Sequence, residues 1–115
     1  MRTKIVLAVA MMMVGSGGQE VPTQVVEMSA ERFAFTPSEV KTKVGTRLEF
    51  RMTSDDTTHG FRLVGTEINV EIPKRGKGKA TVTFVPTEPG TYTFECSHTC
   101  GAGHSFMRGR VVVTR

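Results

Sequence analysis

Tryptophan is absent from the sequence, and tyrosine occurs only once and cysteine only twice among its 115 residues. The sequence also contains no convincing helix of normal length and no internal repeat, which disfavours helical and solenoid folds. Its one long apolar run, residues 5–14, is too short to span a bilayer, which takes roughly 20 apolar residues. The formal net charge is +4, and the roughly +2 that remains without the basic residues of the N-terminus is too small to indicate nucleic-acid binding. A chain of this length is expected to form one domain.

The N-terminus has the three parts of a secretory signal peptide. A basic "MRTK" precedes the apolar "IVLAVAMMMV", and "GSGGQE" then supplies small residues for cleavage. We therefore predict a signal peptide over residues 1–18 and a mature domain over residues 19–115, exported to the periplasm or beyond the cell. An uncleaved weak anchor and a frayed terminus are the alternatives. No transmembrane segment is expected in the mature chain, whose net charge would be about +2 without Arg2 and Lys4.

The mature chain is rich in residues that alternate between apolar and polar. In "TRLEFRMT" the residues Leu48, Phe50 and Met52 fall on one face, which is the period of a half-buried strand. Similar alternation marks "KATVTFV", "TYTFEC" and "GRVVVT", and weaker strands are indicated by "QVVEM", "RFAF", "SEVKTKV", "HGFRLV" and "INVEI". Turn signals separate these runs, so the sequence predicts an all-β sandwich or barrel of about 7–9 short strands.

One segment, "PKRGKGKA", concentrates positive charge in Lys74, Arg75, Lys77 and Lys79. It is expected to be a solvated turn between strands. The alternative is a docking patch for an acidic partner.

The segment "CSHTCGAGHSFM", residues 96–107, gathers both cysteines, two histidines and a methionine. Four of these residues are spaced as one helical face would require, but Gly101 and Gly103 disfavour a helix interior, and a loop before the last strand is expected. Four kinds of chemistry fit such a loop: a disulfide, a redox dithiol, a zinc site and a copper site. Thiolate, thioether and imidazole together favour copper, because zinc sites rarely use methionine.

A mononuclear blue-copper centre uses two histidines, one cysteine and a weak axial methionine. Cys100, His104 and Met107 supply three of these ligands, and His59 is the only histidine outside the loop. Cys96 then has no role, unless it is a second thiolate that bridges two copper ions.

The stretch "YTFECSHTCGAGHSFMRGRVVV" resembles the CuA motif of cytochrome c oxidase subunit II, which nitrous-oxide reductase also contains. The shared pattern is C-x3-C-x3-H-x2-M with a distant upstream histidine, and the resemblance covers about residues 32–113. It implies a cupredoxin-like Greek-key sandwich that holds two copper ions. The ligands it implies are two bridging thiolates, two terminal imidazoles, an axial thioether and the backbone carbonyl of His98; these come from Cys96, Cys100, His59, His104, Met107 and His98.

The sequence departs from the oxidase subunit at three points. His98 stands where the oxidase subunit commonly has glutamate, no transmembrane helices precede the domain, and the tryptophan of the electron entry point is missing. Asp55 and Asp56 are expected to be plain loop residues; orientation of the histidine loop by one of them is the alternative.

The function expected from this pattern is electron transfer, without enzymatic activity, by a monomer. The expected partners are a c-type cytochrome or another small donor, and a terminal oxidase or reductase. The alternatives are a copper carrier that delivers copper to an oxidase, a mononuclear blue-copper protein, and a thiol–disulfide protein.

Overall fold

The computed structural model describes residues 21–115, and within this range the chain forms nine strands and one short 3₁₀ turn. The strands are β1 (Thr23–Glu31), β2 (Ala34–Thr36), β3 (Glu39–Lys43), β4 (Arg47–Ser54), β5 (His59–Leu63), β6 (Asn69–Ile72), β7 (Ala80–Phe84), β8 (Gly90–Glu95) and β9 (Arg108–Thr114). The 3₁₀ turn, His104–Phe106, lies in the long connection between β8 and β9. Nothing helical in residues 21–115 is long and apolar enough to cross a membrane. The predicted signal peptide lies outside the described residues.

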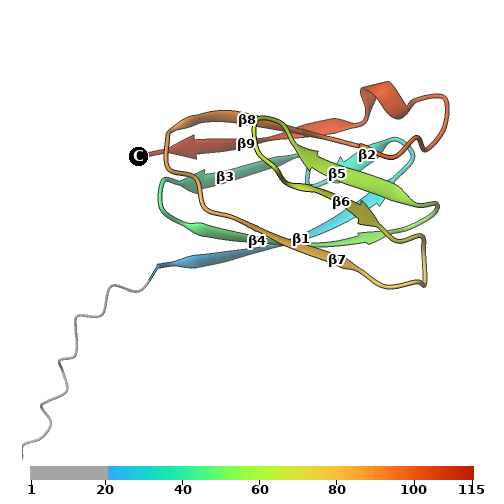
Figure 1. The fold of residues 1–115 in the computed structure, drawn as a ribbon, viewed down its shortest axis with the longest axis horizontal. Helices are drawn as coiled ribbons and strands as arrows, with labels where there is room; N and C mark the ends of the chain where they lie inside the picture. The colour runs from blue at the N-terminus through green and yellow to red at the C-terminus, as the bar shows by residue number, and fades with distance from the viewer. Residues whose placement is uncertain (1–20) are drawn as a thin grey trace, which may run out of the picture.

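The strands form two sheets that pack face to face (Figure 1). One sheet has the order β2-β1-β4-β7, and the other has the order β3-β9-β8-β5-β6. Two neighbouring pairs are parallel, β1 with β4 and β3 with β9, while the remaining pairs are antiparallel. The prediction of an all-β sandwich is therefore confirmed, and its nine strands lie within the expected range.

An aromatic core fills the space between the sheets. Phe35, Phe50, Phe61 and Phe94 are almost fully buried, and their ring centroids lie 5.1–6.5 Å apart in tilted or edge-to-face pairs. Each such ring stabilises the fold by roughly 1.5–3 kcal/mol through burial alone. These rings come from both sheets, so they fix the two sheets against each other.

The alternating pattern predicted for β4 is confirmed, because Leu48, Phe50 and Met52 are all fully buried. In β7 the alternation is present but weaker, and Val82 and Phe84 are only half-buried. The reason is that β7 is an edge strand, so its inner face is covered on one side only. The short β2 begins at Ala34, two residues later than the predicted "RFAF" segment.

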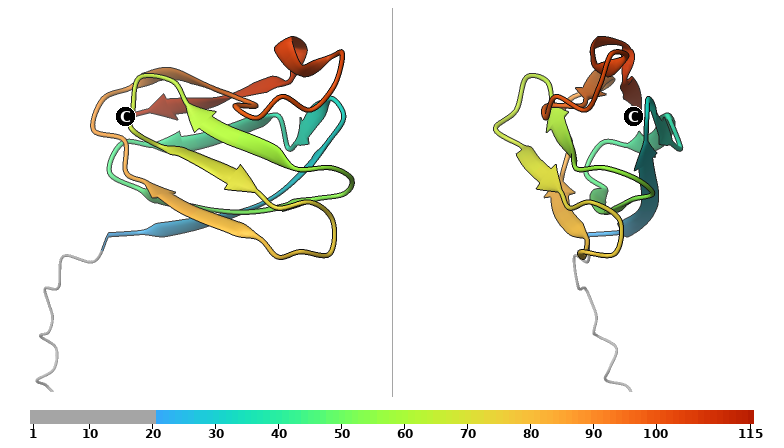
Figure 2. Two further views of the ribbon diagram at one scale, coloured as in Figure 1. Left: turned by 45° about the vertical axis from the view of Figure 1, so that its right-hand side comes forward. Right: turned by 90° about the vertical axis from the view of Figure 1, so that its right-hand side faces the viewer.

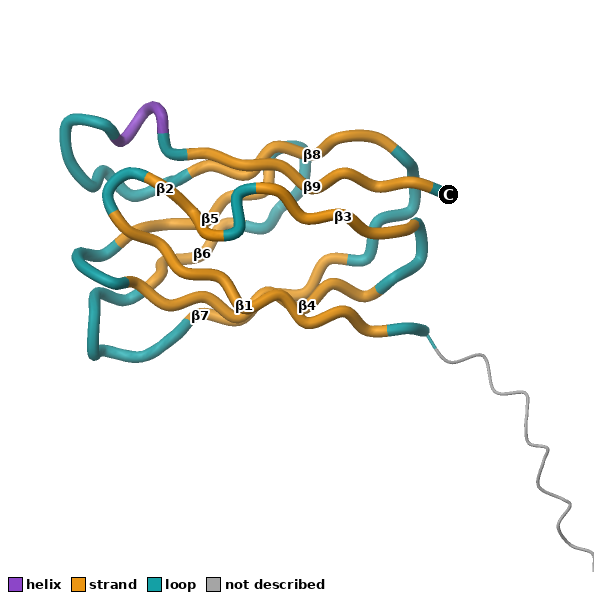
Figure 3. The backbone as a smooth tube through the Cα atoms, turned by 180° about the vertical axis from the view of Figure 1, so that it is seen from behind, coloured by secondary structure: helices purple, strands orange, loops and turns teal. Residues whose placement is uncertain are grey.

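Four connections lie at the same end of the sandwich, opposite the C-terminus (Figures 2 and 3). They are residues 32–33 between β1 and β2, 55–58 between β4 and β5, 73–79 between β6 and β7, and 96–107 between β8 and β9. They meet there because β1, β4, β6 and β8 finish at this end, while β2, β5, β7 and β9 begin at it. We call this end of the molecule the loop end.

Candidate metal centre

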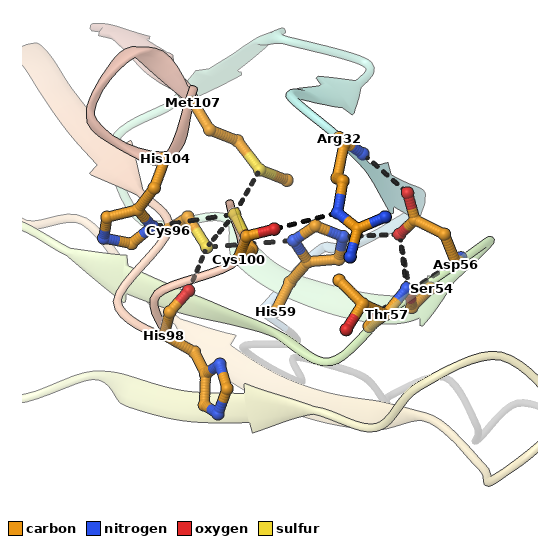
Figure 4. A network of polar contacts seen from close by, with 10 residues as sticks. All are labelled: Arg32, Ser54, Asp56, Thr57, His59, Cys96, His98, Cys100, His104 and Met107. Carbon is orange, nitrogen blue, oxygen red and sulfur yellow. Dashed lines mark hydrogen bonds and ion pairs between the residues drawn. The ribbon is translucent and has the colours of Figure 1, made fainter. Parts of the chain in front are cut away.

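The soft donors predicted from the sequence come together at the loop end (Figure 4). Cys96 directly follows β8 and Met107 directly precedes β9, and the backbone N–H of Cys96 donates to the carbonyl oxygen of Met107 at 3.0 Å. This hydrogen bond closes the base of the connection 96–107, which we call the ligand loop. The predicted loop conformation is confirmed, with the addition of the 3₁₀ turn that begins at His104.

The two cysteines form the middle of the cluster. Their Sγ atoms are 3.7 Å apart, and Met107 Sδ is 3.9 Å from Cys100 Sγ. All three side chains are buried, and both thiols are free. Their sulfur atoms therefore lie together in the buried part of the ligand loop, and no disulfide joins the two cysteines.

His59, at the start of β5, completes the cluster from the neighbouring strand. Its side chain is fully buried, and its Nδ1 atom lies 3.9 Å from Cys96 Sγ. Ligand atoms of His59, Cys96 and Cys100 all lie within 4.8 Å of one another, the spacing of a metal-binding group. The long-range placement of His59 beside the cysteines thus agrees with the expectation from the sequence.

Asp56 fixes the orientation of the His59 ring. Its Oδ1 atom lies 2.7 Å from His59 Nε2, which assigns the ring proton to Nε2 and leaves the Nδ1 lone pair directed at the sulfur atoms. Asp56 was expected to be a plain loop residue, and that expectation is wrong, because the turn between β4 and β5 directs its carboxylate inward. Asp55 is exposed, as expected.

The carboxylate of Asp56 is itself well supplied with donors. Oδ2 accepts the backbone N–H of Arg32 at 2.9 Å, and Oδ1 accepts the N–H of Thr57 at 2.7 Å. Burial alone would raise the pKa of Asp56, but the hydrogen bonds from Arg32, His59 and Thr57 outweigh it and hold the pKa at about 2. Asp56 is therefore a permanent anion behind the His59 ring at neutral pH.

The two histidines of the ligand loop have different surroundings. His104 Nδ1 lies 3.6 Å from Cys100 Sγ, and the ring is half-buried. The ring of His98 points away from the cluster, and its Nε2 atom is 3.6 Å from a carboxylate oxygen of Glu71. The carbonyl oxygen of His98 instead points inward and accepts from Cys96 Sγ at 3.1 Å.

Two residues that the sequence analysis did not single out support the ligand loop from the opposite sheet. Arg32 Nε donates to the carbonyl oxygen of Cys100 at 2.9 Å. The ring of Phe33 packs so closely against Gly103 that a Cβ there would lie 2.5 Å from it. These contacts join residues about 70 positions apart, and no local sequence signal marks them.

Burial and the neighbouring Cys96 raise the pKa of the Cys100 thiol to about 11, although the charge of Arg32 acts in the opposite direction. The Cys100 thiol therefore keeps its proton at neutral pH unless a cation replaces it. Metal binding here would release that proton, so the affinity for metal is expected to fall in acid.

The donor set fits copper. Two thiols and a thioether are soft donors, imidazole nitrogen binds copper readily, and the inward carbonyl adds one oxygen. A β-sandwich that gathers such donors at one end defines a metal-binding protein of the cupredoxin class.

Comparison with known proteins assigns the family. The family model described as "Cupredoxin-like domain" matches residues 4–113, and the chain belongs to this family. Within it, the chain is homologous to the CuA domains of cytochrome c oxidase subunit II and of nitrous-oxide reductase.

Two curated relatives carry this homology. Cytochrome c oxidase subunit 2 of Thermus thermophilus is 37% identical over 81 residues, which cover 70% of this chain and 58% of that protein. Nitrous-oxide reductase of Cupriavidus necator is 34% identical over 92 residues, which cover 76% of this chain and 14% of that protein. The chain thus spans less than two thirds of either relative.

The fold agrees with a solved structure, the periplasmic domain of subunit II of cytochrome oxidase from Bradyrhizobium japonicum. The two chains superpose with a TM-score of 0.72, at 16% identity, over 84% of this chain and 88% of the other. At this identity the likeness concerns the fold.

Proposed function

We propose that this protein is a one-electron carrier whose redox centre is a dinuclear copper site of the CuA type. The observation that carries the proposal is the pair of buried sulfur atoms 3.7 Å apart, with a ring nitrogen of His59 on one side and of His104 on the other (Figure 4). A mononuclear site needs one thiolate, whereas this arrangement offers two equivalent ones.

In the proposed centre, Cys96 and Cys100 would hold the two copper ions through their thiolates. His59 and His104 each bind through Nδ1, the atom that faces the sulfur pair. Met107 and the carbonyl of His98 would complete the set, because Met107 Sδ lies 3.9 Å from Cys100 Sγ and the His98 oxygen lies 3.1 Å from Cys96 Sγ.

The bound copper pair would supply reversible one-electron transfer, with the charge shared between the two ions. The residues of the chain hold the ligands still while that charge changes. Asp56 keeps the His59 ring in one orientation and one tautomer. Arg32 holds the carbonyl of Cys100, and burial of both cysteines and Met107 limits the access of water to the sulfur atoms.

The relatives support a place for the protein in respiratory electron transfer. We propose that it accepts an electron from a c-type cytochrome or another small donor and passes it to a terminal oxidase or reductase. The predicted export signal at residues 1–18 and the periplasmic domain from Bradyrhizobium japonicum support a periplasmic or extracellular location for the domain of residues 19–115. We expect the domain to act as a monomer and not as an enzyme.

Copper reconstitution of residues 19–115 tests the proposal, with metal analysis and electron paramagnetic resonance as the readouts. Two copper ions per chain, with one unpaired electron split by both nuclei, are expected. One copper ion with a single-nucleus splitting would instead indicate a mononuclear protein that uses Cys100 alone. Preferential uptake of zinc, or copper that passes readily to a chelator, would favour a zinc site or a copper carrier.

Two histidine variants form a matched pair for the ligand assignment. His59→Ala removes a ring that faces the sulfur atoms, whereas His98→Ala removes a ring that points outward and leaves the backbone carbonyl in place. The dinuclear signal is expected to disappear in the first variant and to persist in the second. Loss of the signal in both would contradict the carbonyl role of His98.

A further inference from the structure

The connection between β6 and β7, residues 73–79, is a second feature of the loop end. It contains Lys74, Arg75, Lys77 and Lys79 and no acidic residue, and all four cationic side chains are exposed. Within residues 21–115, none of the four takes part in an ion pair, although six ion pairs occur elsewhere. We call this segment the basic loop. Its charge is free to act on an approaching molecule.

The basic loop is bonded directly to the histidine side of the candidate metal centre. The backbone N–H of Arg75 donates to the carbonyl oxygen of Asp56 at 3.0 Å. Asp56 in turn holds the His59 ring, and His59 faces Cys96. Two residues, Asp56 and His59, therefore link the basic loop to the sulfur pair, and the basic loop and the ligand loop lie at the same end of the molecule (Figure 1).

Charge is distributed unevenly between the two ends of the sandwich. The four connections at the loop end carry five cationic residues against two carboxylates, and one of those carboxylates, Asp56, is engaged with His59. The ligand loop carries no lysine, arginine or acidic residue. At the opposite end, residues 44–46, 64–68 and 85–89 contain two glutamates and no lysine or arginine. The connections at the loop end therefore carry more positive charge than the connections at the opposite end.

We propose that the basic loop is a docking element that binds an acidic surface patch on the redox partner protein and holds it against the candidate metal centre. The proposal rests on the electron-transfer function proposed above and adds the chemistry of the partner. A cationic patch next to a redox site raises the rate of encounter with an anionic surface and favours productive orientations.

A protein surface suits the basic loop better than a membrane or a nucleic acid. Stable binding to a membrane takes an apolar or lipid anchor in addition to basic residues, and residues 73–79 offer no apolar side chain apart from Pro73. Nucleic-acid binding takes a more extended basic surface than one short loop provides. A basic patch at the same end as the centre also serves a partner that carries its own redox group better than it serves a membrane or a nucleic acid.

Electron-transfer kinetics with small charged reductants test the proposal on the copper-loaded protein. The variant Lys74→Glu/Lys77→Glu reverses two charges in the basic loop. The matched control, Lys41→Glu/Lys43→Glu, reverses two exposed lysines on β3, which runs away from the loop end. Both variants change the net charge equally. Hexacyanoferrate(II) serves as the anionic reductant and hexaammineruthenium(II) as the cationic one; each gives up one electron, which the centre takes up.

At low salt the basic-loop variant is expected to react about tenfold more slowly with the anionic reductant, and the control variant less than about twofold more slowly. The cationic reductant should show the opposite order. Both differences should vanish near 1 M salt, where the screening length is about 3 Å. Equal effects of the two variants would overturn the proposal, because net charge and not the position of the loop would then set the rate.

A titration that does not depend on copper separates this proposal from the function on which it rests. Poly-glutamate is added to isotope-labelled protein, and amide shifts are expected at residues 73–79 and 55–59. Shifts confined to other surfaces would overturn the docking site even where a copper centre forms. If no copper centre forms, the proposed function fails, while the titration still shows whether the basic loop is the surface that binds an acidic partner. Binding to anionic phospholipid vesicles, without any effect of the loop variant on the kinetics, would assign the basic loop to a membrane and overturn the proposal.

Discussion

Gly103→Ala tests whether Phe33 holds the ligand loop in position. Gly103 has φ −93° and ψ 14°, a conformation that alanine can adopt, so the substitution acts through contact and not through the backbone. The new Cβ would lie 2.5 Å from Phe33 Cδ2 and 2.6 Å from Cγ, so the ring or the loop must move. Such overpacking costs about 1–3 kcal/mol, and the lost freedom of the unfolded chain offsets about 0.4–1 kcal/mol of it. The Phe33 ring is 37% exposed and can yield towards solvent, so we expect a net destabilisation of about 1 kcal/mol.

A double-mutant cycle with Phe33→Ala isolates this contact. Without the ring, Gly103→Ala should be neutral or slightly stabilising, which gives a coupling energy of about 1–2 kcal/mol. Gly45→Ala is the control, because Gly45 has φ +88° and no atom within 4 Å of a Cβ built there. This substitution therefore destabilises the protein through backbone strain alone. Urea unfolding of the reduced, metal-free variants measures all of these energies. A coupling near zero, or an equal coupling between Gly45 and Phe33, would refute the role assigned to the ring.

Three further predictions concern the site and the core. Asp56→Asn should lower the free energy of unfolding of the metal-free protein by about 2 kcal/mol at pH 6. Because the pKa of Asp56 is held at about 2, below its ordinary value of 3.8, this contribution is lost as the pH falls from about 4 to about 2, and urea unfolding at pH 2.5 should show a smaller deficit. Met107→Leu nearly conserves volume at a buried position and should cost less than about 1.5 kcal/mol, while the absorption spectrum and the reduction potential of the copper-loaded protein shift. Phe94→Ala should destabilise the protein by about 3–5 kcal/mol in the same urea assay, because its ring contacts three others in the core.

The parts of the structure that could be predicted from the sequence are those set by local pattern. Alternation of apolar residues located β4 because a strand with one buried face repeats every two residues. The ligand loop was recognisable because Cys96, Cys100, His104 and Met107 lie within twelve consecutive residues. His59 could be added because no other histidine lies outside the loop.

The supporting contacts could not be predicted, because they depend on how distant segments meet. Arg32 reaches Cys100 across 68 positions, and nothing near Arg32 in the sequence marks it as a partner of the ligand loop. The choice between Asp55 and Asp56 depends on the turn after β4, where the N–H groups of Arg32 and Thr57 draw the carboxylate of Asp56 inward. Asp55 and Asp56 are adjacent residues of the same type, so only the backbone geometry of the turn decides which carboxylate faces His59.

The two sheets contribute different residues to the candidate metal centre. His59 lies on β5, and the other donors lie in the ligand loop, which joins β8 to β9. These three strands are adjacent interior strands of one sheet, so each is hydrogen-bonded to a neighbour on both sides. The residues that support the ligand loop, Arg32 and Phe33, follow β1 in the other sheet. The aromatic core fixes these two sheets against each other. The ligand loop is therefore held at both ends by interior strands of one sheet and in its middle by Arg32 and Phe33 from the other. Such support would suit the electron transfer proposed above, in which the ligands keep their places as the charge changes, better than the alternative of a copper carrier, whose site must open to release copper.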